Sequence, residues 1–158
     1  MLEDPRITAM GLFVEAFSGV NARLNVQLAE HGLGNVDFEV LVRLARSPGG
    51  ELRMTDLAAQ TGLSTSGVTR VVDRLERDGL ATRRACPTDR RGSFTVITAA
   101  GSAKMREVLP GHVALIEEWF TGRLSPTGLD ALLSGLRTIR DAVRPEATSG
   151  VPSMHPAA

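Results

Sequence analysis

The 158-residue chain has little of what marks a secreted, disulfide-bonded or membrane-spanning protein. Its one cysteine, Cys86, excludes an intramolecular disulfide and suits a reducing cytoplasm. No apolar run approaches the roughly 18 residues that a membrane span requires. The opening residues, MLEDPRITAM, lack the basic start of a secretory signal. We therefore expect a cytoplasmic protein with no membrane association.

Catalytic patterns are also missing from the sequence. We find no nucleophile paired with a base, no phosphate-binding loop and no spacing typical of metal ligands. Apolar residues make up 42% of the chain, which indicates a folded globular protein. We expect a binding protein that requires no cofactor, and not an enzyme.

The formal net charge is zero, so the chain as a whole is not a polycation. The charge is nevertheless uneven, because residues 64–93 contain seven arginines and only four acidic residues. These are Arg70, Arg74, Arg77, Arg83, Arg84, Arg90 and Arg91 against Asp73, Glu76, Asp78 and Asp89. Such a local basic patch is typical of a site for a polyanion, although a solvated helix with internal ion pairs has the same composition.

Apolar residues at intervals of three and four predict a mainly helical chain. The predicted helices cover residues 7–30, 38–46, 56–61, 65–78, 99–120 and 126–144. Four of these helices have a hydroxyl side chain at the predicted N-cap, namely Thr55, Ser64, Thr98 and Ser125. Pro110 lies inside the fifth helix, so we expect a kink or a break near Leu109.

A small β-hairpin is the only other regular structure that the sequence predicts. Residues 81–85 and 93–97 favour strands, joined by the turn CPTDRRG, and residues 51–53 form a candidate third strand. We expect a helix-turn-helix with this hairpin over 35–98 and a flexible tail over 146–158. The end helices, 5–34 and 99–145, bury their apolar stripes most simply against each other and a second copy of the chain.

The segment LAAQTGLSTSGVTRVVDRLERDGL, residues 57–80, contains the helix-turn-helix, with Gly62 at the sharp turn. On a helical wheel the second helix has one apolar face, made by Val68, Val71, Val72 and Leu75. The opposite face carries Ser66, Arg70, Asp73, Arg74 and Arg77, with Thr69 at its edge. The apolar face must pack, so the polar face is predicted to meet solvent or a ligand.

That polar face suits the major groove of DNA. Hydroxyl groups near the start of the helix, on Ser64, Thr65, Ser66 and Thr69, can reach phosphate or base edges. Arg70 can address guanine O6 and N7 through two parallel hydrogen bonds, whereas Arg74 and Arg77 are expected to meet backbone phosphate. Asp73 is three residues after Arg70 and four before Arg77, and we expect it to pair with both.

The hairpin turn offers a second DNA contact. PTDRRG is a short basic tip, and Arg90 and Arg91 suit the negative potential of the minor groove. Asp89 stands two residues before Arg91 and can brace it. An ordinary solvated turn is the alternative interpretation.

These motifs resemble the MarR (multiple antibiotic resistance regulator) family of winged-helix transcription factors. The resemblance rests on LAAQTGLSTSGVTRVVDRLERDGLATR, PTDRRG and VITAAG, and is specific over about 54–101. It implies a mainly helical homodimer in which intertwined end helices join two winged domains that read a palindrome, usually to repress genes. It also implies that 64–70 is the reading end of the recognition helix, and that Arg91, oriented by Asp89, is the wing-tip arginine.

Residues that bind an effector are harder to find in the sequence. The resemblance implies a small-molecule pocket between the dimer region and the winged domain, for which Phe13, Phe17, His112 and Trp119 are candidates. The alternative is that these four side chains belong to the core and the dimer interface.

Metal or redox control is a second possibility. A zinc site assembled from Glu30, His31 and His112 is a minor candidate, and His155 lies in the predicted tail. Cys86 lies near several arginines, which favour a reactive thiolate, but the chain has no second cysteine to form a disulfide with it. A winged helix that contacts only other proteins is the remaining alternative.

Overall fold

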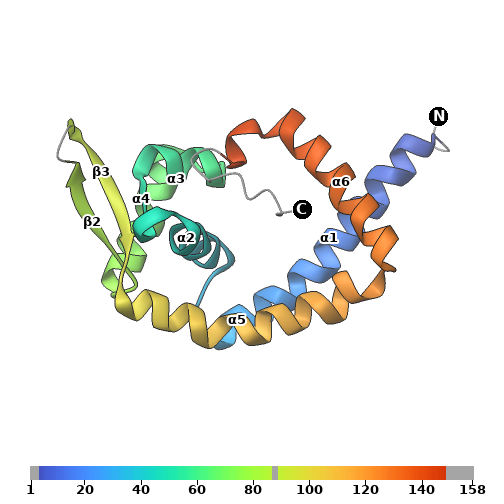
Figure 1. Ribbon diagram of the computed structural model, residues 1–158, viewed down its shortest axis with the longest axis horizontal. Coiled ribbons are helices and arrows are strands. Elements are labelled where there is room, and N and C mark those ends of the chain that lie inside the picture. The colour runs from blue at the N-terminus through green and yellow to red at the C-terminus, as the bar shows by residue number, and fades with distance from the viewer. Residues whose placement is uncertain (1–3, 87–88, 149–158) are drawn as a thin grey trace, which may run out of the picture.

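Six α-helices and a three-stranded antiparallel sheet build the computed structural model, which describes residues 4–86 and 89–148 (Figure 1). For residues 89–91 only the backbone is described. The helices are α1 (Pro5–Glu30), α2 (Asn35–Arg46), α3 (Met54–Thr61), α4 (Thr65–Arg77), α5 (Ala99–Trp119) and α6 (Pro126–Val143). The strands are β1 (Glu51–Arg53), β2 (Ala81–Cys86) and β3 (Asp89–Ile97).

Side-chain caps fix three of the helix starts that the sequence predicts. The hydroxyls of Ser64, Thr98 and Ser125 each accept a hydrogen bond from a backbone N–H three residues later, at 3.1, 2.9 and 3.2 Å. The predicted cap at Thr55 is wrong, because α3 already begins at Met54 after an extended Arg53. Hydroxyl caps are thus a better guide to α4, α5 and α6 than to the short α3.

The sheet has the order β1-β3-β2, which confirms the hairpin and the third strand. Leu52 of β1 lies opposite Thr95 of β3, and Arg84 of β2 lies opposite Phe94. β3 begins at Asp89, four residues earlier than we expected, because Cys86 pairs with Asp89 across an irregularity in the ladder. The hairpin therefore extends as a narrow ribbon from one end of the molecule (Figure 1).

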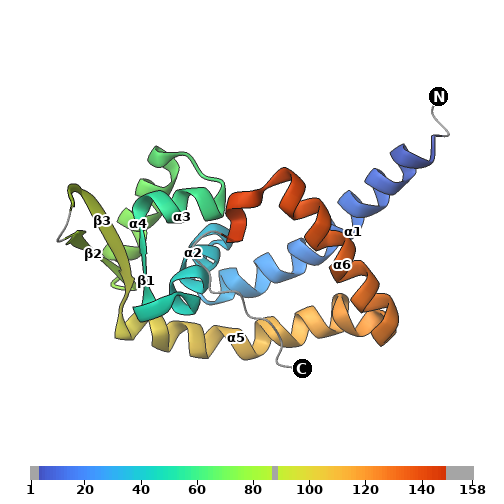
Figure 2. The ribbon, with the colours of Figure 1, turned by 45° about the horizontal axis from the view of Figure 1, so that its top comes forward.

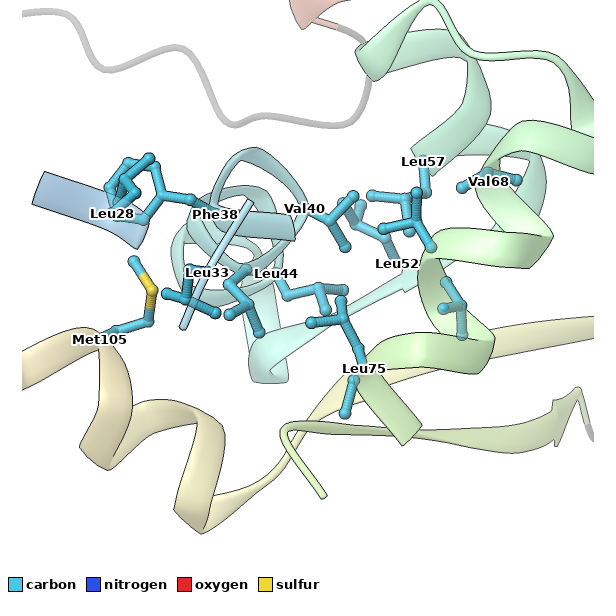
Figure 3. Close-up of a cluster of buried hydrophobic side chains, with 14 of the residues drawn as sticks. Leu28, Leu33, Phe38, Val40, Leu44, Leu52, Leu57, Val68, Leu75 and Met105 are labelled. Atoms are coloured by element: carbon cyan, nitrogen blue, oxygen red, sulfur yellow. The ribbon is translucent and has the colours of Figure 1, made fainter. Parts of the chain in front are cut away.

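The apolar face of α4 packs into the main hydrophobic core. Val68, Val72 and Leu75 are essentially inaccessible to solvent, and Val71 is nearly so. In Figure 3, Val68 lies near Leu57 of α3, in a cluster that continues through α2 to Met105 of α5. Burial of one such side chain contributes about 1.5–3 kcal/mol, so this face fixes how α4 is rotated.

Pro110 does not break α5, so of the kink or break that we expected near Leu109 the break does not occur, and a kink stays a prediction. One helix runs from Ala99 to Trp119 with Pro110 inside it. Proline removes the backbone donor that would bind the carbonyl of Arg106. Both Pro110 and Arg106 are exposed, so water can bind the carbonyl that loses its partner.

The two chain ends form a helical region beside the helix-turn-helix. Helix α1 lies along α5. Helix α6 runs from the far end of α5 back toward α3 (Figures 1 and 2). We expected a flexible tail over 146–158, but Pro145–Thr148 form a 3₁₀ helix that contacts α3. Arg43 of α2 donates to the carbonyl of Ala147 at 3.0 Å. Residues 149–158, including His155, lie outside the described residues.

No helix within the described ranges combines the length and the apolar character that a bilayer crossing demands.

Candidate DNA-binding surface

The outward face of α4 is open to solvent, as its amphipathic pattern predicts. Ser66, Arg70, Asp73 and Arg77 are exposed, while every residue of the apolar face is buried. Ser64 and Thr65 are also exposed at the start of the helix, where backbone N–H groups and the helix dipole favour an anion.

Two of the predicted hydroxyl contacts already serve the helix itself. Ser64 caps α4 and lies 3.1 Å from the Ser66 hydroxyl, and Thr69 donates to the carbonyl of Thr65 at 2.8 Å. Thr65 and Ser66 keep exposed side chains at the same end. The predicted hydroxyl groups are therefore present at the start of α4. The hydroxyls of Ser64 and Thr69 already bond to the helix backbone, so a ligand would share them with the helix.

Arg74 has a different partner from the phosphate that the sequence suggests. Its Nε and Nη2 both donate to Asp37 of α2, with the shortest contact, from Nη2 to Oδ1, at 2.5 Å. The Asp37 side chain is only 10% exposed. This hydrogen-bonded pair raises the pKa of Arg74. Arg74 therefore joins α4 to α2 in this structure, and its contact with phosphate stays a prediction.

Replacing Arg74 with alanine is expected to lower the free energy of unfolding by about 2 kcal/mol, because Asp37 would remain buried without its cation. Arg77→Ala is the matched control on the same helix, and since Arg77 is exposed it should change stability by no more than about 0.5 kcal/mol. Urea unfolding at one protein concentration measures both. Equal effects would contradict a structural role for Arg74.

Asp73 also pairs differently from our expectation. Its Oδ1 accepts a hydrogen bond from Nη2 of Arg83 on β2 at 2.7 Å, and not from its helix neighbours. Arg70 has no hydrogen-bond or ion-pair partner among the described residues. Within the described part of the chain, Arg77 pairs only with its neighbour Asp78, at 3.3 Å and in solvent. Two cations of α4 therefore stay available on its outer face.

The wing is present as the β2–β3 ribbon, next to α4 (Figure 1). Arg84 on this ribbon is neutralised by Glu51 of β1, at 2.6 and 2.7 Å, and lies 5.0 Å from the ring of Phe94. The side chains of Asp89, Arg90 and Arg91 lie outside the described residues, so their minor-groove role stays a prediction.

Comparison with known proteins decides the family. The model of the MarR family matches residues 31–92. The transcriptional regulator MhqR of Bacillus subtilis is 34% identical over 103 residues, which are 65% of this chain and 70% of MhqR. The chain belongs to the MarR family.

Solved structures of the MarR family agree with this fold over nearly the whole chain. AbsC of Streptomyces coelicolor superposes with a TM-score of 0.86 and 35% identity, covering 92% of this chain and 98% of AbsC. Sco3205 of the same organism, solved in complex with DNA, has a TM-score of 0.86 and 30% identity, covering 100% and 96%. The winged-helix fold and its membership in a family of transcription regulators are therefore confirmed.

The four candidates for a ligand pocket do not line one cavity in the described part of this MarR-family chain. Phe13 and Phe17 point to solvent on α1, with exposed fractions of 53% and 61%. His112 is buried against the ring of Phe38, with 4.3 Å between ring centroids. Trp119 lies under the guanidinium groups of Arg23 and Arg123. A pocket made of these four residues stays a prediction that one protomer does not support.

The candidate zinc ligands are also apart. His31 Nδ1 lies 2.9 Å from a carboxylate oxygen of Glu107, and this contact, together with Lys104, lowers the pKa of Glu107. His112 is engaged with Gln27, and no group of three or more possible ligands occurs within residues 4–86 and 89–148. The proposed grouping of Glu30, His31 and His112 is therefore not formed here.

Cys86 ends β2 with its side chain buried, at 6% exposure. Redox sensing by a thiol needs access for the oxidant as well as a low pKa. Burial argues against the redox alternative that the neighbouring arginines suggest.

His112 makes stability depend on pH. Burial lowers its pKa below the usual value, so between the two values the unfolded chain binds more protons than the folded one. The stability that the neutral His112 side chain contributes is fully present above about pH 6.5, the ordinary pKa of histidine. This stability decreases as the pH falls. We expect acidification from about pH 7.5 to about 5.5 to destabilise the wild type more than His112→Gln. Urea unfolding at both pH values checks this, and parallel losses would contradict it.

Proposed function

We propose that this MarR-family protein is a sequence-specific DNA-binding transcriptional regulator, which acts as a repressor and binds a palindromic operator as a homodimer. The observation that carries the proposal is the outer face of α4. There, Arg70 and Arg77 face solvent without a strong partner among residues 4–86 and 92–148, on a helix whose opposite face is buried in the core. A helix held in this way can enter the major groove, with its arginines on base edges and phosphate.

A second copy of the chain is the best partner for the exposed apolar residues of the chain ends. Ile7, Met10 and Phe17 of α1 are each more than half exposed, as are Ile139 and Val143 of α6. Exposed apolar surface of this kind on two helices is typical of an interface. The dimer would then carry two α4 helices, as a palindrome requires. Release by a small-molecule effector stays a prediction from the family.

Selection of duplexes from a randomised library by the full-length protein tests the proposal. We expect enrichment of a palindrome, and an affinity that falls steeply with salt because several counterions are released. Sedimentation should give twice the mass of the chain. A dimer that retains no duplex at low salt would instead favour a module that contacts only proteins.

A further inference from the structure

Arg83 of β2 lies against the charged side of α4. Its Nη2 donates to Asp73 Oδ1 at 2.7 Å and to the carbonyl of Thr69 at 3.3 Å. Its Nη1 forms an ion pair with Glu76, whose other oxygen accepts the Arg83 backbone N–H at 2.6 Å. One guanidinium from the wing therefore holds two carboxylates of the proposed recognition helix.

This arrangement is built into the fold and is not a loose surface contact. The Arg83 side chain is 29% exposed and that of Glu76 is 30% exposed, whereas Asp73 remains 58% exposed. A planar guanidinium group can bind two carboxylates at once with little further loss of side-chain conformational freedom. The backbone bond to Glu76 anchors β2 at the point where Arg83 enters the cluster.

Asp73 has two other cations within reach on its own helix. Residues three and four apart on a helix are neighbours, and Arg70 and Arg77 stand at those distances from Asp73. Glu76 differs, because it is six residues from Arg70 and adjacent to Arg77, on a different side of the turn. If Arg83 were absent, Asp73 could therefore pair with a DNA-binding arginine, whereas Glu76 could not do so readily.

We propose that Arg83 is a positioning residue for DNA binding, which engages Asp73 and thereby leaves Arg70 and Arg77 free for the duplex. This inference rests on the proposed function. Arg83 itself does not contact DNA in this account. It acts through Asp73, and it links the wing to the recognition helix so that both elements present their cations together.

The test compares affinities for the selected palindromic duplex at fixed salt. Arg83→Gln should weaken binding on the order of tenfold per half-site, the value of a good arginine–base contact. Adding Asp73→Asn to Arg83→Gln should restore most of the affinity, because the competing carboxylate is gone. Adding Glu76→Gln removes the same charge from the same helix and should not restore it.

Each other pattern overturns the inference. Equal rescue by both second substitutions would mean that net charge alone matters, and rescue by neither would mean that Arg83 only supports the fold. Undiminished binding by Arg83→Gln would also refute it. If the wild-type dimer binds no duplex, the proposed function fails as well, which separates the two cases.

Thermal unfolding shows whether the variants are folded. Should Arg83→Gln not fold, Arg83→Lys replaces it. A lysine keeps the charge but cannot grip both carboxylates with a planar fork. Arg83→Lys should lose less affinity than Arg83→Gln, and Asp73→Asn should again restore it whereas Glu76→Gln should not. The same three contrary patterns would refute the inference.

Discussion

Gly101→Ala is expected to destabilise the protein by about 2–4 kcal/mol, through overpacking and the weakening of one hydrogen bond. Gly101 is buried in the first turn of α5, where an added Cβ would lie 2.1 Å from the carbonyl oxygen of Leu80 and 2.9 Å from Ile97. That carbonyl belongs to the backbone and accepts the N–H of Thr98 at 3.1 Å. The methyl group can therefore be accommodated only if α5 moves away from the winged domain.

Gly111→Ala is the matched control, because it places the same methyl group in the same helix. Gly111 is exposed, and an added Cβ would lie 3.5 Å from the side chain of Gln27, which is an ordinary contact. Alanine is the better helix former by up to about 1 kcal/mol, so this variant should be neutral or slightly more stable. Urea unfolding at one protein concentration compares them, and equal midpoints would refute the close approach at Gly101.

Local features of the fold could be predicted from the sequence because their causes are local. The alternation of faces in α4 follows from a period of 3.6 residues, and the caps at Ser64, Thr98 and Ser125 act over three residues. The outward face of α4 follows in the same way, since Val68, Val72 and Leu75 leave only one side for Arg70.

The partners of the charged side chains could not be predicted, because they come from distant parts of the chain. Arg74 and Asp37 are 37 residues apart, and His31 and Glu107 are 76 apart. Rules for helix neighbours consider only residues three or four apart, so they predicted that Asp73 pairs with Arg70 and Arg77. The tertiary fold brings β2 beside α4, where Arg83 is the better partner because it binds Asp73 and Glu76 together.

The chain ends show a further limit. Periodicity correctly placed Phe13 and Phe17 on an amphipathic helix, but it cannot tell a side chain that faces its own core from one that faces a second copy. Both are exposed in one protomer. The expected pocket between the dimer region and the winged domain would be lined by residues that are distant in the sequence, and no periodic pattern specifies which of them meet.

Arg70→Ala is expected to have the largest effect on DNA recognition. Arg70 is exposed on the outer face of α4, less than two turns from its start, and has no ion-pair partner in the described ranges. If it forms two hydrogen bonds with guanine, its removal should abolish about 1–3 kcal/mol of discrimination at one position in each half-site. Repeating the duplex selection with the variant should therefore show one relaxed position per half-site.

Two arginine controls separate base reading from general attraction. Arg77→Ala on the same face should weaken binding to all sequences and reduce the salt slope by about one per half-site, hence about two for the dimer, as expected for a phosphate contact in each half-site. Arg106→Ala removes the same charge from α5, where Arg106 is exposed, and should leave both preference and salt slope unchanged. If Arg70→Ala behaves like Arg77→Ala and keeps the full base preference, Arg70 binds phosphate, and the bases must be read by another residue of α4. If it behaves like Arg106→Ala, the outer face of α4 does not enter the groove, because an exposed arginine of that face would then be irrelevant to binding.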